Sequence, residues 1–101
     1  MNEERKRELS RSRDWRAVFK IFERFGEDER LWRHVNLETK SIDFPAMLEG
    51  GTFSGGERRL LKVAAYLFSQ DYEVNLWSVL AGLDKENSAA VVEAVREFTR
   101  G

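Results

Sequence analysis

Apolar positions recur every three or four residues along most of the chain, which is the period of one face of an α-helix. The first such stripe consists of Trp15, Val18, Phe19, Phe22 and Phe25. It predicts a long helix over residues 3 to about 25, within which Ser12 provides a second N-cap before Arg13. Gly26 is expected to end this helix, because glycine is common just beyond a helix C-terminus.

The middle of the chain has a less regular pattern. Residues 27–34 predict a short helical turn. Apolar and polar positions then alternate across residues 35–44, which permits either a short β-hairpin or an irregular loop. Asp43-Phe44-Pro45 predicts the start of another helical turn, reaching Leu48, because proline is favoured at the first helical position.

Three further helices are predicted in the second half. One runs from Gly55 to about Ser69, and a turn at Gln70-Asp71 follows it. Asn75 and Asp84 are good N-caps for helices over residues 76–83 and 85–98. The last helix is expected to bury a stripe of Val91, Val92, Val95 and Phe98. The fold class is therefore mainly α, a small bundle of four to five helices with a possible short β-hairpin near residues 35–44.

The composition agrees with one small folded domain. The chain has 101 residues, of which 42% are hydrophobic and 12% aromatic, enough for a single core. Residues 1–101 are therefore predicted to form one helical domain, with residues 1–12 as a frayed basic N-terminal extension. Seventeen basic residues are balanced by 18 acidic ones, so no overall field draws the protein to nucleic acid or anionic lipid.

The absence of cysteine excludes disulfides and thiolate chemistry. The charged N-terminus is not followed by the apolar block of a secretory signal, and no apolar run approaches the roughly 20 residues of a membrane span. The sequence therefore predicts a cytoplasmic protein that does not contact a membrane.

One motif has two interpretations. Phe53-Ser54-Gly55-Gly56-Glu57 resembles the signature sequence of ABC-type ATPases, although phenylalanine stands where leucine is usual. The resemblance implies contact with the γ-phosphate of an ATP held by another subunit. That role also requires a phosphate-loop lysine, and aligning Gly51 and Gly56 with the loop's glycines places Glu57 at the lysine position. The chain is also too short for the surrounding ATPase fold.

The same residues predict a helix start. Ser54 and Glu57 have the spacing of a capping box, in which each side chain accepts a hydrogen bond from the other residue's backbone amide, and Phe53 is placed to staple onto the first turn. We therefore favour structural capping. A role in which this segment completes another protein's ATP site is the less favoured interpretation.

No catalytic, cofactor or metal site is predicted. His34 is the single histidine, with no cysteine and no carboxylate at a recognised ligand spacing. No serine lies in a Gly-x-Ser-x-Gly elbow. The sequence therefore predicts a protein that is not an enzyme and that needs no cofactor.

Two groups of residues are candidates for binding. Trp32 beside Arg30 and Arg33 is a candidate protein-binding group, because tryptophan and arginine dominate interface hot spots; a core position for Trp32 is the equal alternative. The strongest charge bias is basic and could contact phosphates; it comprises Arg5, Lys6, Arg7, Arg11, Arg13 and Arg16.

The function predicted first is a non-enzymatic protein-interaction module: an adaptor, an inhibitor or a subunit of an assembly. Accessory proteins of phages and mobile elements share these general features. The partner would be another protein, with a homo-oligomer also compatible. The alternative is a nucleic-acid-associated protein that uses the basic N-terminal helix.

Overall fold

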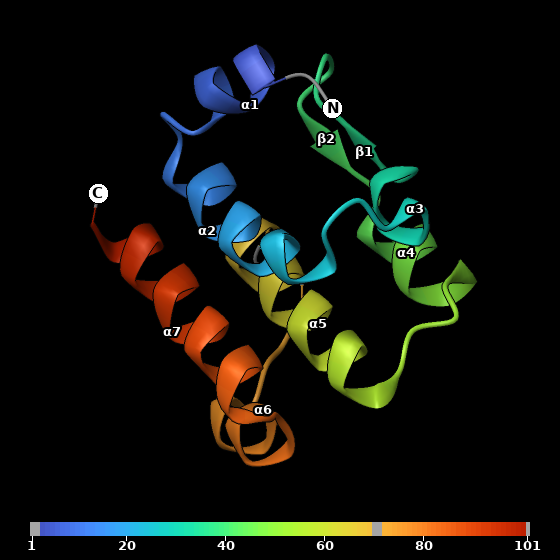
Figure 1. Cartoon of the computed structure of the whole chain (residues 1–101), viewed down its shortest axis with the longest axis vertical. Helices are drawn as coiled ribbons and strands as arrows, with labels where there is room; N and C mark the ends of the chain where they lie inside the picture. The colour runs from blue at the N-terminus through green and yellow to red at the C-terminus, as the bar shows by residue number, and fades with distance from the viewer. Residues whose placement is uncertain (1–2, 70–71, 101) are drawn as a thin grey trace.

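The computed structural model describes residues 3–69 and 72–100. Across these residues, seven α-helices, a 3₁₀ helix and a two-stranded sheet follow one another along the chain (Figure 1). In order they are α1 (Glu3–Leu9), α2 (Arg13–Phe22), η1 (Glu23–Phe25), α3 (Glu29–Trp32), β1 (Val35–Asn36), β2 (Ser41–Ile42), α4 (Phe44–Gly50), α5 (Gly55–Ser69), α6 (Leu76–Gly82) and α7 (Lys85–Thr99). The mainly α fold with a hairpin is confirmed.

Helix α2 lies at the centre of the molecule, packed against both α5 and α7 (Figure 1). Small and β-branched side chains allow this close approach, since Val18, Ala64 and Ala94 have essentially no exposed surface. Aromatic rings close the core beside them. Trp15 meets Phe68 edge to face at 5.1 Å between ring centroids, an arrangement that aromatic pairs prefer.

The predicted continuous helix over residues 3 to about 25 is wrong, because the chain turns between α1 and α2 and tightens into η1 at the end. Arg16 supports the turn by donating from Nη1 to the carbonyls of Ser10 and Arg11, at 3.2 and 3.0 Å. Ser12 does occupy the N-cap position of α2, as predicted, although its side chain makes no capping hydrogen bond. Gly26 ends η1 with φ of 60°, a conformation that favours glycine.

The hairpin that the sequence permitted is present. Strands β1 and β2 pair antiparallel, with Val35 opposite Ile42 and Asn36 opposite Ser41. The Asn36 side chain organises the connecting loop, because its Oδ1 accepts hydrogen bonds from the amides of Glu38 and Thr39 at 3.0 Å. This is the local bonding expected of asparagine in turns.

The predicted helix starts in the second half are confirmed. The side chains of Asp43, Asn75 and Asp84 accept from the amides three residues on, at 3.1, 3.1 and 2.8 Å. Helix α5 has the bounds that the sequence predicted. The turn predicted at Gln70-Asp71 lies outside the described residues.

The predicted buried face of α7 is wrong in part. Val91 is buried as expected, but Val92 and Val95 are 50% and 39% exposed. The helix instead packs through Ala90, Val91 and Ala94, because the short alanine side chains let its backbone approach α2 closely.

Candidate functional site

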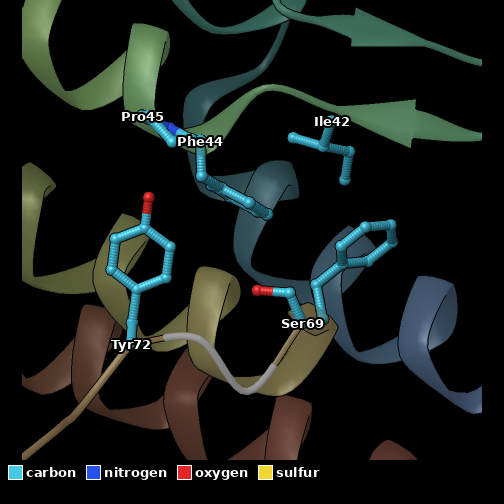
Figure 2. Close-up of a pocket in the computed structure, with 6 residues that line it drawn as sticks. Ile42, Phe44, Pro45, Ser69 and Tyr72 are labelled. Atoms are coloured by element: carbon cyan, nitrogen blue, oxygen red, sulfur yellow. The ribbon is translucent and has the colours of Figure 1, made fainter.

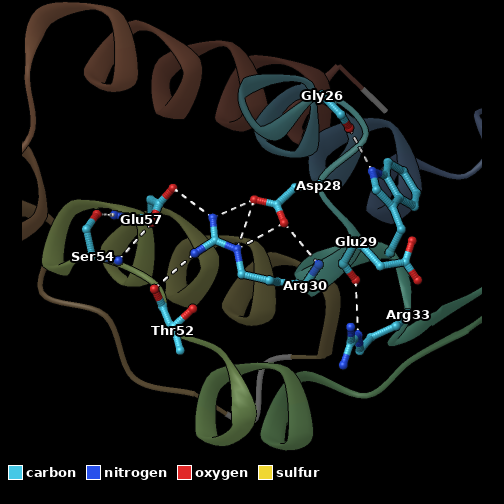
Figure 3. Close-up of polar contacts among 9 residues, drawn as sticks. Gly26, Asp28, Glu29, Arg30, Arg33, Thr52, Ser54 and Glu57 are labelled. Atoms are coloured by element: carbon cyan, nitrogen blue, oxygen red, sulfur yellow. Dashed lines mark hydrogen bonds and ion pairs between the residues drawn. The ribbon is translucent and has the colours of Figure 1, made fainter.

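The start of α5 is closed by the capping box that the sequence predicted (Figure 3). Glu57 Oε1 accepts from the amide of Ser54 at 2.8 Å, and Ser54 Oγ accepts from the amide of Glu57 at 3.2 Å. The preceding Phe53 is buried and meets Phe25 edge to face at 5.8 Å. The motif therefore fixes both the first turn of α5 and the direction from which the chain enters it.

Arg30 connects this helix start to α3 (Figure 3). Its guanidinium binds the Asp28 carboxylate, with Nη2 at 2.6 Å from Oδ2, and donates from Nη1 to the carbonyl of Thr52 at 2.9 Å. It also lies 3.5 Å from Glu57 Oε2 and 4.5 Å from the centre of the Phe53 ring. The hydrogen bond from Arg30 lowers the pKa of Asp28 below its usual range. One cation thus holds four groups around the capping box.

The backbone amides of Gly55 and Gly56 donate no hydrogen bond to an acceptor in the part of the chain that the structure describes. Ser54 and Gly55 are exposed, and the first amides of a helix attract anions. The Arg59 guanidinium lies nearby, because a Cβ built on Gly55 would be 3.7 Å from its Nη1. Arg59 also covers Gly82 at the end of α6. The Arg59 guanidinium therefore lies beside the first turn of α5, a position that the sequence analysis did not identify.

The predicted protein-binding group makes contacts within the molecule. The Trp32 indole donates to the carbonyl of Gly26 at 2.7 Å, and its ring meets Phe22 edge to face. Arg33 donates to the carbonyl of Glu29 at 3.3 Å (Figure 3). These contacts give Trp32, Arg30 and Arg33 structural roles that need no partner, and their binding to another protein stays a prediction.

Some basic residues of the N-terminal segment make contacts within the molecule, and others are exposed to solvent. Arg16 donates to backbone carbonyls, and Arg13 lies 4.6 Å from the centre of the Phe98 ring. Lys6 lies over Phe19, and Arg5 pairs with Glu8 and Glu38. Arg7 and Arg11 are exposed, near Glu4 and Glu8. Phosphate binding by this set stays a prediction.

The structure places no group of histidine and carboxylate side chains together as a site, among the residues that it describes. His34 belongs to the hairpin, where its carbonyl accepts from the amide of Asp43 at 2.9 Å. Across residues 3–69 and 72–100, no three histidine, aspartate or glutamate side chains converge as a metal site would require. None of the helices described there is long and apolar enough to cross a membrane.

An open groove of about 430 Å³ lies between the hairpin, α4 and the end of α5 (Figure 2). Tyr72 and Pro45 lie at one side of it, and the hydroxyl of Ser69 donates to the carbonyl of Ala65 at 3.1 Å. No charged side chain lines the described part of the groove; its lining is Ile42, Phe44, Pro45, Phe68, Ser69 and Tyr72.

The most exposed apolar surface is on α6, which the sequence analysis did not select. Trp77 is 78% exposed and Leu76 is 52% exposed, while Val79 is the buried residue of this helix. A sequence feature could have identified it: residues 74–83 contain no charged side chain, in a chain that is 35% charged. An uncharged helix that buries so little of itself is unusual for a monomer surface.

Comparison with known proteins gives two partial similarities. The chain is 30% identical over 82 residues to the phosphonates import ATP-binding protein PhnC of Agrobacterium fabrum, and 28% identical over 82 residues to the same protein of Rhizobium meliloti. The match covers 81% of this chain but 29% of each relative. No family model matches the chain, and no solved structure matches it.

The length of the matched stretch limits where it can lie in this chain. A continuous stretch of 82 residues in a chain of 101 begins no later than residue 20 and ends no earlier than residue 82. The similar region therefore includes the capping box and all of α6. The matched region makes up 29% of each relative, so each relative has more than twice that length outside the matched region.

Proposed function

We propose that this chain is a non-enzymatic protein-interaction module that binds a larger ATP-binding chain of the importer type through α6. The observation that supports this most directly is the exposure of Trp77, 78%, beside Leu76 on an uncharged helix. A tryptophan buried at an interface is a typical hot spot, whereas an exposed one contributes little to folding.

The relatives support the nature of the partner. The 82-residue region that they share with this chain includes α6, and in them it belongs to a much longer ATP-binding chain. Trp77 and Leu76 of α6 lie within this shared region and are exposed. A separate ATP-binding chain is therefore a fitting partner for α6, and the module would act as an adaptor, an inhibitor or an assembly subunit.

The experiment places a photo-crosslinking benzoylphenylalanine at position 77 in the native host and identifies the crosslinked protein by mass spectrometry. We expect an ATP-binding importer subunit in stoichiometric amounts. The matched control places the same group at Tyr66, which is 45% exposed on α5, and should not capture that subunit. Equal capture from both positions, or none from position 77, contradicts the proposal.

Once the partner is identified, Trp77→Ala should raise the dissociation constant of the complex by roughly 30-fold or more, the effect of removing a hot spot of about 2 kcal/mol. The same substitution should leave the free energy of unfolding of the isolated chain nearly unchanged, because the side chain is exposed. Isothermal titration calorimetry and urea unfolding measure the two quantities.

A second candidate function is contact with the phosphates of an ATP held by that partner. The specific observation is that the stretch matched by the ATP-binding proteins spans Ser54-Gly55-Gly56-Glu57, where the Arg59 guanidinium lies beside the first turn of α5. Since this candidate needs a second chain to hold the nucleotide, it depends on the first proposal.

Gly56→Ala separates this candidate from simple capping. A Cβ at Gly56 has one neighbour within 4 Å, a Leu83 methyl carbon at an ordinary 3.9 Å, so alanine should stabilise α5 by about 0.5–1 kcal/mol. If the backbone receives a phosphate, the same methyl group should weaken nucleotide-dependent complex formation at least tenfold. Higher stability with unchanged nucleotide dependence would leave capping as the role of the motif.

A further inference from the structure

Helix α6 is short, and few of its side chains hold it to the rest of the molecule. Of the described residues Leu76–Gly82, Val79 alone is buried. Just beyond the helix, a methyl carbon of Leu83 lies near Gly56, at 3.9 Å from a Cβ built there. A helix of about two turns with one buried side chain depends on further contacts to keep its position.

The Arg59 side chain, from near the start of α5, meets the C-terminal end of α6. A Cβ built on Gly82 would lie 2.8 Å from both Cζ and Nε of Arg59, and 3.0 Å from its Nη1. The guanidinium thus occupies the space that any side chain at position 82 would need. The same Nη1 lies 3.7 Å from a Cβ built on Gly55, so the guanidinium bridges the start of α5 and the end of α6.

This place suits a cation. The last carbonyl groups of a helix carry partial negative charge, and a cation beside them is stabilising. Helix α6 has no basic side chain in its own last turn, and Arg59 supplies one from a different helix. Arg59 forms no hydrogen bond or ion pair with another residue that the structure describes. Its packing against the end of α6 is therefore the contact that gives the guanidinium its place.

We propose that Arg59 is a positioning residue for the partner-binding helix. Its guanidinium fixes the end of α6 against α5, and so sets the place from which Trp77 meets the partner. Trp77 and Gly82 are about 7.5 Å apart along the axis of one short helix, so a shift at the Gly82 end also moves Trp77. The inference rests on the proposed function, because it assigns Arg59 to the same interface.

Hydrogen exchange of the α6 amides in the isolated chain tests the contact. Gly82→Ala places a methyl group where the guanidinium lies, and the flexible end of an arginine can move away without disturbing the core. Alanine by itself favours a helix over glycine and would slow exchange about fivefold. If Arg59 holds α6, the lost contact outweighs this preference, and residues 79–81 should exchange several-fold faster than in the unmodified chain. Slower exchange in Gly82→Ala overturns the proposal.

The effect of Gly82→Ala should change direction when Arg59 is absent. In an Arg59→Ala background no guanidinium meets the new methyl group, so adding Gly82→Ala should slow exchange in α6. The same direction of change in both backgrounds contradicts the contact.

Gly50→Ala is the matched control. Gly50 also ends a seven-residue helix, α4, but a Cβ built on it meets nothing within 4 Å. The substitution should slow exchange within α4 and leave α6 unchanged. Faster exchange in α4 would show that alanine at a helix end is itself disruptive, and would remove the support that Gly82→Ala gives to the Arg59 contact.

Partner capture separates positioning from a merely structural role. Arg59→Ala should reduce photo-crosslinking from position 77 to the importer subunit several-fold, while thermal unfolding of the isolated chain stays nearly unchanged because Arg59 is exposed. Gly82→Ala, which keeps the charge but displaces it, should reduce capture as well. Capture that survives both substitutions overturns the positioning role and leaves the α6 proposal standing. Absence of capture with Arg59 and Gly82 intact contradicts the α6 proposal, and the positioning role with it.

Discussion

At the scale of single residues, Arg30 has the most connections around the candidate site. It joins the Asp28 carboxylate, the Thr52 carbonyl, the Glu57 carboxylate and the Phe53 ring. The sequence placed Arg30 beside Trp32 and suggested a binding surface. The structure shows instead that its guanidinium is turned toward the capping box (Figure 3), because the neighbouring Asp28 carboxylate converges there with the Thr52 carbonyl and the Glu57 carboxylate from farther along the chain.

The Arg30 contact predicts a specific acid sensitivity. Since its hydrogen bond lowers the pKa of Asp28 below the ordinary 3.8, the ionised carboxylate stabilises the folded state above that pH. This stabilisation is lost as pH falls from about 4 through the lower folded-state pKa. Asp28→Asn should remove this part of the acid destabilisation, as measured by thermal unfolding across pH.

Asp84→Asn is the matched control for this measurement. Asp84 is also an N-cap, accepting from the amide of Asn87 at 2.8 Å, and asparagine caps a helix about as well as aspartate. The Asp84→Asn protein should retain the acid destabilisation that Asp28→Asn removes. Identical pH profiles for the two variants would contradict a special role for the Arg30 contact.

At the scale of elements, α7 shows the difference between periodicity and packing. Its apolar positions repeat at helical spacing, and the sequence therefore predicted that Val92 and Val95 share the buried face with Val91. In the structure Ala90, Val91 and Ala94 are buried. Four valines and alanines in adjacent positions leave the helix rotation undetermined by pattern alone, and close approach to α2 favoured the face with the smaller residues.

Val91→Ala and Val92→Ala measure this rotation directly. Val91 is 1% exposed, so its truncation should lower the free energy of unfolding by about 2 kcal/mol through lost burial and a residual cavity. Val92→Ala should change it by no more than about 0.5 kcal/mol, toward higher stability, because alanine is the better helix former. Urea unfolding at low protein concentration distinguishes them, and equal losses would contradict the observed rotation.

At the scale of the whole molecule, the N-terminal segment is part of the packed structure. Leu9 at the end of α1 is 5% exposed within the core cluster, and Arg5 reaches Glu38 in the hairpin loop at 2.9 Å. The sequence indicated a frayed basic extension over residues 1–12 because charged residues dominate it. One buried leucine and contacts to residues far along the chain give residues 3–9 a defined place.

Leu9→Ala should therefore lower the free energy of unfolding by about 2–3 kcal/mol, the usual loss for truncating a buried leucine. Differential scanning calorimetry gives the value. A change below about 0.5 kcal/mol, as expected for a surface residue, would show that α1 is not held against the core.

The predicted nucleic-acid role is tested by separate variants of the same segment. Arg7→Gln with Arg11→Gln removes two exposed cations and should leave stability nearly unchanged. If the segment binds phosphates, the double variant should weaken binding and reduce its salt dependence. Fluorescence anisotropy with labelled duplex DNA at several salt concentrations measures both, and unchanged binding would exclude these two residues.

The sequence by itself determined the helix starts, because caps depend on residues within three or four positions of one another. It left the segment 35–44 open between a hairpin and an irregular loop. Asp43, Asn75 and Asp84 cap as predicted, and the Ser54-Glu57 capping box forms with both of its hydrogen bonds. A pattern that resembles a nucleotide motif is thus, at the local level, a helix start that the sequence specifies completely.

The tertiary structure alone decided which faces are covered. The break between α1 and α2, the rotation of α7, the connections of Arg30 and the exposure of Trp77 depend on contacts between residues far apart in the chain. Such contacts depend on how the side chains of different helices fit together and on which of them fill the core. The spacing of hydrophobic residues along one helix does not contain this information. The exposed face of α6 therefore could be identified only from the folded structure.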